Sequence, residues 1–135
     1  MLARGSGALV HIGSISGNHQ QAFSNAYSAS KAGVSMLSRQ LAYEWGPRGV
    51  RSNVVSPGLV RTALSEAFYT DEKTRAAREK VVPLRRIGRV DDIADAVLYF
   101  ASERTSYVTG EEIIIDGGYA QTLMSHVPRP GFNDD

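Results

Sequence analysis

Tyr27 and Lys31 lie four residues apart in a run of small residues over 26–33. On a helix, side chains at this spacing share one face, so a phenol and an ammonium group would be neighbours. A cation beside a phenol favours the phenolate, which makes the hydroxyl a better proton donor and acceptor near neutral pH. Ser14 ends an apolar, strand-like segment thirteen positions before Tyr27. These three side chains predict proton transfer to or from a carbonyl or an alcohol.

The elements that must position these groups alternate between strand and helix. Apolar runs predict strands over residues 8–12, 50–55 and 112–116. Helical patterns cover residues 26–45, 63–80 and 91–100, whereas 14–25 is expected as a loop and 119–135 as an extended tail. The alternation predicts an α/β fold, in which three parallel strands with crossover helices form part of a doubly wound sheet.

Polar residues and turns follow the carboxyl ends of the first two predicted strands. Ser14 follows the first strand, Pro57 and Gly58 follow the second, and Thr62 lies just beyond them. Ligands of doubly wound sheets bind at this edge. Tyr-x-x-x-Lys alone is a weak signal, since a packed tyrosine and a solvated lysine give the same spacing. The convergence at one edge of the sheet favours the functional interpretation.

The composition excludes several other classes of function. The 15 basic and 14 acidic residues are balanced and dispersed, which argues against nucleic-acid binding, and the absence of cysteine excludes thiol chemistry and cysteine-bound zinc. His11 is expected to be packed in its strand, and His19 and His126 are isolated, so no metal site is predicted. Ile15 occupies the central position of the Gly13–Gly17 run, which excludes a serine-hydrolase nucleophile elbow. No apolar run could span a membrane and no secretion signal is evident, so a cytoplasmic protein is expected.

Several motifs together resemble the short-chain dehydrogenases/reductases of the single-domain, NAD(P)-dependent type. The matching stretches occur in the family's order and spacing across most of the chain. They are Gly13-Ser14-Ile15-Ser16-Gly17, Tyr27-Ser28-Ala29-Ser30-Lys31-Ala32-Gly33, the segment 50–58 ending in Ser56-Pro57-Gly58, Thr109-Gly110 and Asp116-Gly117-Gly118.

The resemblance implies roles for individual residues. Tyr27 would be the general acid/base that interconverts an alcohol and a carbonyl, with Ser14 steadying the substrate oxygen and Lys31 assisting the phenolate. The cofactor would be NAD or NADP, and the partners a small alcohol or ketone and further copies in a homodimer or homotetramer. Residues 63–86 would form a mobile substrate lid. The implied cofactor-binding residues are Tyr27, Lys31, Pro57, Gly58, Val60 and Thr62.

The family's Gly-rich phosphate-binding turn and the asparagine of its proton relay have no counterpart in this sequence. Residues 1–118 therefore resemble the carboxyl-terminal portion of a Rossmann-type dinucleotide-binding domain, followed by a tail over 119–135. An unpaired apolar edge strand invites aggregation. Such a chain alone is therefore expected to be marginally stable or insoluble, and it is not expected to bind a dinucleotide tightly. An alternative is an inactive truncated product, or an interaction module that pairs with a full-length relative through its small-residue helix.

Overall fold

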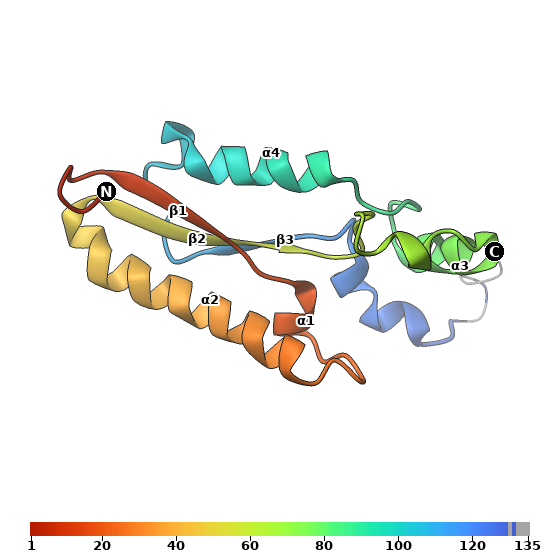
Figure 1. The fold of residues 1–135 in the computed structure, drawn as a ribbon. Helices are drawn as coiled ribbons and strands as arrows, with labels where there is room; N and C mark the ends of the chain where they lie inside the picture. The colour runs from red at the N-terminus through yellow and green to blue at the C-terminus, as the bar shows by residue number, and fades with distance from the viewer. Residues whose placement is uncertain (130, 132–135) are drawn as a thin grey trace.

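A parallel sheet of three strands forms the centre of the computed structural model, which describes residues 1–129 and 131 (Figure 1). The strands are β1 (Gly7–Ile12), β2 (Val50–Pro57) and β3 (Glu112–Ile115), in the order β1-β2-β3. Residues 7–12 of β1 pair with 50–55 of β2, and residues 54–57 of β2 pair with 112–115 of β3. The predicted α/β fold with a parallel sheet is confirmed.

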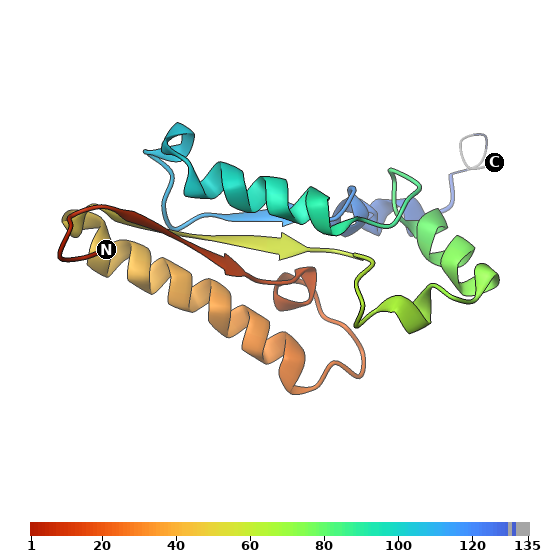
Figure 2. The same cartoon turned by 45° about the horizontal axis from the view of Figure 1, so that its top comes forward.

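Two long helices cover the opposite faces of this sheet (Figures 1 and 2). They are α2 (Ala26–Trp45) and α4 (Val90–Ala101), and the carboxyl-terminal end of the sheet carries the shorter helices α1 (Ile15–Asn18) and α3 (Glu72–Val81). Because β2 is the central strand and is covered on both faces, Val50 and residues 52–56 are all buried. Short 3-10 turns complete the described chain: η1 (Gly46–Arg48), η2 (Glu66–Phe68), η3 (Glu103–Thr105), η4 (Tyr119–Gln121) and η5 (Leu123–His126).

Small side chains form the buried face of α2. Ser35, Ser38 and Ala42 are buried, whereas Leu37, an apolar position of the predicted helical pattern, is 51% exposed. The Ser38 hydroxyl lies 3.0 Å from Ser52 Oγ on β2, and Ser52 Oγ is also 3.0 Å from His11 Nε2 on β1. Hydrogen bonds therefore satisfy these buried hydroxyl groups where the helix lies against the sheet.

Polar side chains of β2 dock the segment that connects α4 to β3. Asn53 is fully buried; its Nδ2 donates to the Val108 carbonyl at 2.9 Å, and its Oδ1 accepts from the Glu111 amide at 3.0 Å. The Arg51 guanidinium donates to the Phe100 carbonyl at 3.0 Å. Side chains of β2 thus satisfy backbone groups that no strand or helix would satisfy, and they hold β3 in register.

The sequence pattern predicts one helix over residues 63–80, and this is wrong for its first part. The Ser65 hydroxyl accepts from the Thr62 amide at 2.9 Å and donates to the Val60 carbonyl at 2.8 Å, which closes a local turn. Asp71 then caps a new helix by accepting from the Thr74 amide at 2.7 Å. Hydroxyl and carboxylate groups that bond to nearby backbone compete with helix continuation, so α3 begins only after Asp71.

Two other expected segments also differ from the structure. The expected loop over 14–25 contains α1, because the Ser14 hydroxyl caps that helix by accepting from the Ser16 amide at 3.1 Å. Residues 119–126 form η4 and η5 rather than an extended tail. The Asp116 carboxylate starts this turn by accepting from the Gly118 and Ala120 amides at 2.8 and 2.6 Å. Tail residues 130 and 132–135 lie outside the described residues.

Candidate active site at the carboxyl edge of the sheet

Ser14 lies at the carboxyl end of β1, where the chain turns into α1. Its side chain is buried, and its Oγ accepts a hydrogen bond from the Ser16 amide. Because the oxygen acts as acceptor in this cap, the hydroxyl hydrogen can be donated to another oxygen. The cap therefore orients Ser14 and leaves it able to donate.

Gly17 brings α1 against α2 at the level of Lys31. A Cβ at Gly17 would lie 2.9 Å from the carbonyl carbon of Lys31 and 3.0 Å from the amide nitrogen of Ala32. Both atoms belong to the backbone of α2, which cannot move aside as a flexible side chain could. Glycine at this position therefore permits the close approach of the Ser14 segment to the helix that carries Tyr27 and Lys31.

Lys31 connects α2 to the end of β1. Its Nζ donates to the Ile12 carbonyl at 2.9 Å and lies 5.8 Å from the centre of the Tyr27 ring. Tyr27 is half-exposed on the first turn of α2, so its side chain is partly open to solvent. The structure thus holds Lys31 beside the Tyr27 ring and against the end of β1. Ile12, whose carbonyl accepts from Lys31, precedes Ser14 by two residues. The catalytic roles of these three residues stay a prediction.

The second group of predicted residues follows β2 at the same edge. The Gly58 amide donates to the Ile115 carbonyl at 3.0 Å, which ties this turn to the end of β3. Val60 forms a parallel bridge with Gly88, and the Thr62 amide donates to Ser65 Oγ. The loop implied to bind the cofactor is therefore held by Ser65 and Gly88, which the motifs did not single out. Both residues come later in the chain than the loop, so these contacts form only when the segment after Thr62 folds back onto it.

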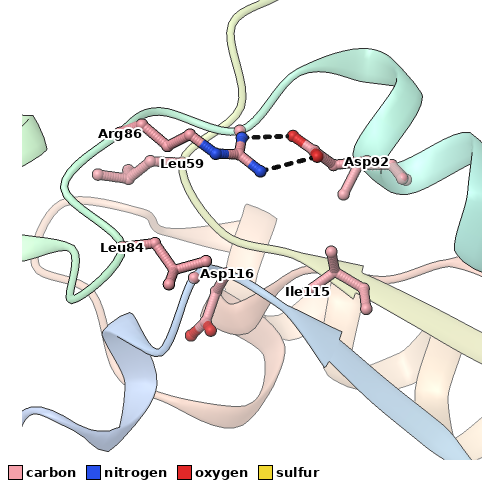
Figure 3. A pocket seen from close by; sticks show the side chains of 9 residues that line it. Leu59, Leu84, Arg86, Asp92, Ile115 and Asp116 are labelled. Atoms are coloured by element: carbon pink, nitrogen blue, oxygen red, sulfur yellow. Dashed lines mark hydrogen bonds and ion pairs between the residues drawn. The ribbon is translucent and has the colours of Figure 1, made fainter.

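A cavity of about 180 Å³ lies beside this loop, between β3 and the start of α4 (Figure 3). Arg86 and Asp92 form a two-pronged ion pair at the cavity, with N–O distances of 2.7 and 2.9 Å. Arg86 is therefore paired with a carboxylate in this structure. The cavity does not include Ser14, Tyr27 or Lys31. Its lining includes Leu59, Leu84, Arg86, Asp92, Ile115 and Asp116.

The Arg86 guanidinium holds the pKa of Asp92 well below its usual range, and the Arg89 amide adds to this by donating to Asp92 at 2.7 Å. Asp92 therefore stays ionised at neutral pH and caps the start of α4. Across residues 1–129 and 131, no three His, Asp or Glu side chains gather closely enough to hold a metal ion. Over the same residues, the longest helices are too short or too polar to cross a membrane.

The family model described as enoyl-(acyl carrier protein) reductase matches residues 1–120. The chain belongs to the short-chain dehydrogenase/reductase family. Among solved structures, this family member is similar to a short-chain type dehydrogenase/reductase from Mycobacterium ulcerans, with a TM-score of 0.83 and 31% identity over 100% of this chain and 50% of that chain. A gluconate 5-dehydrogenase from Burkholderia cenocepacia, solved with NADP and tartrate, gives a TM-score of 0.83 and 29% identity over 89% and 47%.

Curated members of the family are also similar in sequence. Galactitol 2-dehydrogenase (L-tagatose-forming) from Cereibacter sphaeroides is 41% identical over 121 residues, which are 88% of this chain and 48% of that protein. Cis-4-hydroxycyclohexanecarboxylate dehydrogenase from Sinomonas cyclohexanicum is 42% identical over 120 residues, which are 88% and 47%. The chain spans about half the length of the curated relatives it matches.

Proposed function

We propose that this chain carries the proton-transfer site of an NAD(P)-dependent oxidoreductase that interconverts a secondary alcohol and a ketone. The observation that carries the proposal is the position of Lys31 Nζ, which is anchored on the Ile12 carbonyl and lies beside the Tyr27 ring. This places a cation near the phenol and close to the strand end that bears Ser14. The names of the relatives support the class of substrate, since galactitol and 4-hydroxycyclohexanecarboxylate both carry secondary alcohols.

Each of the three side chains has a distinct part in ketone reduction. The Tyr27 hydroxyl gives its proton to the substrate oxygen, and the Ser14 hydroxyl donates a hydrogen bond to the same oxygen. Lys31 stabilises the phenolate that remains on Tyr27, because its ammonium group has two donors beyond the one on the Ile12 carbonyl. Alcohol oxidation uses the same groups in reverse, with the Tyr27 phenolate accepting the proton.

The residues at the carboxyl edge of the sheet fit the nicotinamide end of the cofactor. They combine a lysine, a tyrosine and a turn held by the Gly58 amide and by the Val60–Gly88 bridge. A turn held by its own backbone bonds offers a pre-formed surface for a planar ring. Bound NAD(P)H would supply the hydride. The residues proposed to hold it are Tyr27, Lys31, Pro57, Gly58, Val60 and Thr62.

Substitution of Tyr27 tests this function against a matched change on the same helix. The purified protein is incubated with a panel of secondary alcohols that includes galactitol. NAD⁺ or NADP⁺ is raised to saturation, because this chain is not expected to bind a dinucleotide tightly, and formation of the reduced cofactor is followed by absorbance. Tyr27→Phe removes the proton donor and should lower kcat about 100-fold or more. Tyr43→Phe changes an exposed tyrosine near the other end of α2 and should leave kcat within about twofold of the wild type. A Tyr27→Phe variant as active as Tyr43→Phe would contradict the proposal.

The outward face of α2 supports a second candidate function, a pairing module without catalysis. Ala29, Ala32, Gly33 and Met36 are exposed on this helix, and small residues permit close helix–helix approach. Gly33→Leu should then dissociate a self-associated or mixed complex in sedimentation experiments. A wild-type protein that oxidises none of the alcohols but loses association in Gly33→Leu would favour this candidate. In the oxidoreductase, the same face is proposed to form part of a homodimer or homotetramer contact.

A further inference from the structure

Glu112 is a carboxylate at the start of an otherwise apolar strand, and its side chain is only 9% exposed. Removing a carboxylate from water is unfavourable unless hydrogen bonds or opposite charges compensate. Here Oε1 accepts from Asn18 Nδ2 at 2.7 Å and from the Ser56 hydroxyl at 2.5 Å. Oε2 lies 3.8 Å from Nη2 of Arg39. Three polar partners thus surround one carboxylate.

The partners come from three elements that carry the proposed active site. Asn18 is the last residue of α1, the helix capped by Ser14. Ser56 directly precedes Pro57 on β2, and Arg39 lies on α2, which also carries Tyr27 and Lys31. Glu112 therefore contacts α1, β2 and α2, although no proposed role involves Glu112 itself.

The backbone before Ser14 lies against the same cluster. A Cβ at Gly13 would collide with the Ser56 hydroxyl and would lie 2.8 Å from Cγ1 of Val54. Glycine at position 13 therefore allows the Ser56 hydroxyl to reach Glu112 beneath the start of the Ser14 turn. The cluster around Glu112 therefore contacts residues 13–18 at their beginning, through Gly13, and at their end, through Asn18.

We propose that Glu112 is a positioning residue for Ser14. A helix of four residues is not stable by itself, so its orientation depends on what holds its ends. One end of α1 is held by the Ser14 cap, and the other by the Asn18–Glu112 hydrogen bond, which spans 94 residues of sequence. Through Asn18, Glu112 sets the direction in which Ser14 presents its hydroxyl. The inference rests on the proposed function, in which Ser14 contacts the substrate oxygen.

The first test measures amide hydrogen exchange in the protein, because α1 should loosen when its distal end is released. The Gly17 and His19 amides report on α1, since they donate to the Ser14 and Ile15 carbonyls at 2.9 and 2.8 Å. Loss of one hydrogen bond to a charged group should make them exchange about tenfold faster. Glu112→Val removes the carboxylate that accepts from Asn18, so this variant should show the faster exchange.

Three further variants make the exchange test specific. Asn18→Ala changes an exposed residue, leaves the core intact and should also accelerate exchange about tenfold. Glu112→Gln retains a side-chain oxygen that can accept from Asn18 and Ser56, so it should exchange like the wild type. Glu111→Val makes the same change at the adjacent exposed glutamate and should have no effect on α1.

The second test is a double-mutant cycle on kcat with Ser14→Ala. Glu112→Val should lower kcat about tenfold when Ser14 is present and less than about twofold in the Ser14→Ala background, because residues that act as a unit are not additive. A merely structural role of Glu112 would lower kcat equally in both backgrounds.

Three outcomes overturn the inference. The first is unchanged exchange of α1 in both Glu112→Val and Asn18→Ala, and the second is a Glu112→Gln variant as impaired as Glu112→Val. The third is an equal loss of kcat from Glu112→Val in the wild-type and Ser14→Ala backgrounds. The proposed function fails separately, if the wild-type protein oxidises no secondary alcohol. In that event the exchange measurement still decides whether Glu112 holds α1.

Discussion

Gly17→Ala tests whether the approach of α1 to α2 sets the geometry of the active site. The added Cβ would lie 2.9 Å from the Lys31 carbonyl carbon and 3.0 Å from the Ala32 amide nitrogen. Nonbonded carbon contacts are comfortable at about 3.5–4.0 Å. The Ser14 segment and α2 must therefore separate by roughly 0.5–1 Å. This movement would carry the Ser14 hydroxyl away from Tyr27 and Lys31.

The size of the expected effect follows from that separation. A misplacement of about 1 Å in a catalytic group can lower a rate by about 100-fold, so Gly17→Ala should lower kcat for alcohol oxidation by about 10- to 100-fold. Overpacking at a close contact should also reduce the free energy of unfolding by about 1–3 kcal/mol. The first quantity is measured by steady-state kinetics and the second by urea denaturation followed by circular dichroism.

Gly33→Ala is the matched control, since it makes the same change within α2 itself. An added Cβ at Gly33 meets no atom of non-neighbouring residues within 4 Å. Alanine also favours a helix more than glycine does, so it should be tolerated and should raise stability by up to about 1 kcal/mol. The reasoning is refuted if Gly17→Ala keeps wild-type kcat and stability, or if the two variants behave alike.

Other predictions concern the charge at the site and the packing beneath it. Lys31→Met should lower kcat about 100-fold, whereas Arg48→Met at an exposed position of η1 should change it by less than about twofold. Equal rates for the two variants would argue against an electrostatic role. Asn53→Ala removes two buried hydrogen bonds and should reduce the free energy of unfolding in urea by about 2–4 kcal/mol; a loss below about 1 kcal/mol would contradict the docking role. Arg86 lowers the pKa of Asp92 in the folded protein, so the stability that Asp92 contributes is present above pH ~4 and is lost as the pH falls. Thermal unfolding of Asp92→Asn should accordingly depend less on pH between about 5 and 3 than that of the wild type, and identical slopes would exclude this contribution.

Local sequence patterns were sufficient to predict the main architecture and the nearest neighbours at the site. The apolar runs identify all three strands within two residues at either end, and the helix that begins at Ala26 ends before Gly46 as predicted. The spacing of Tyr27 and Lys31 places them on one face of that helix, because helical periodicity depends only on nearby backbone bonds. The same patterns misjudged residues 63–71, where hydroxyl and carboxylate caps outweigh helix propensity.

What the sequence determined by itself is therefore the identity of the reactive groups and the strand–helix alternation that bears them. The tertiary structure alone decided how the elements are held together: Lys31 on the Ile12 carbonyl, Gly17 against α2, and Glu112 between Asn18 and Ser56. The physical reason is range. Periodicity and capping act over a few residues, whereas each of these contacts joins residues brought together only when strands pair and helices cover the sheet.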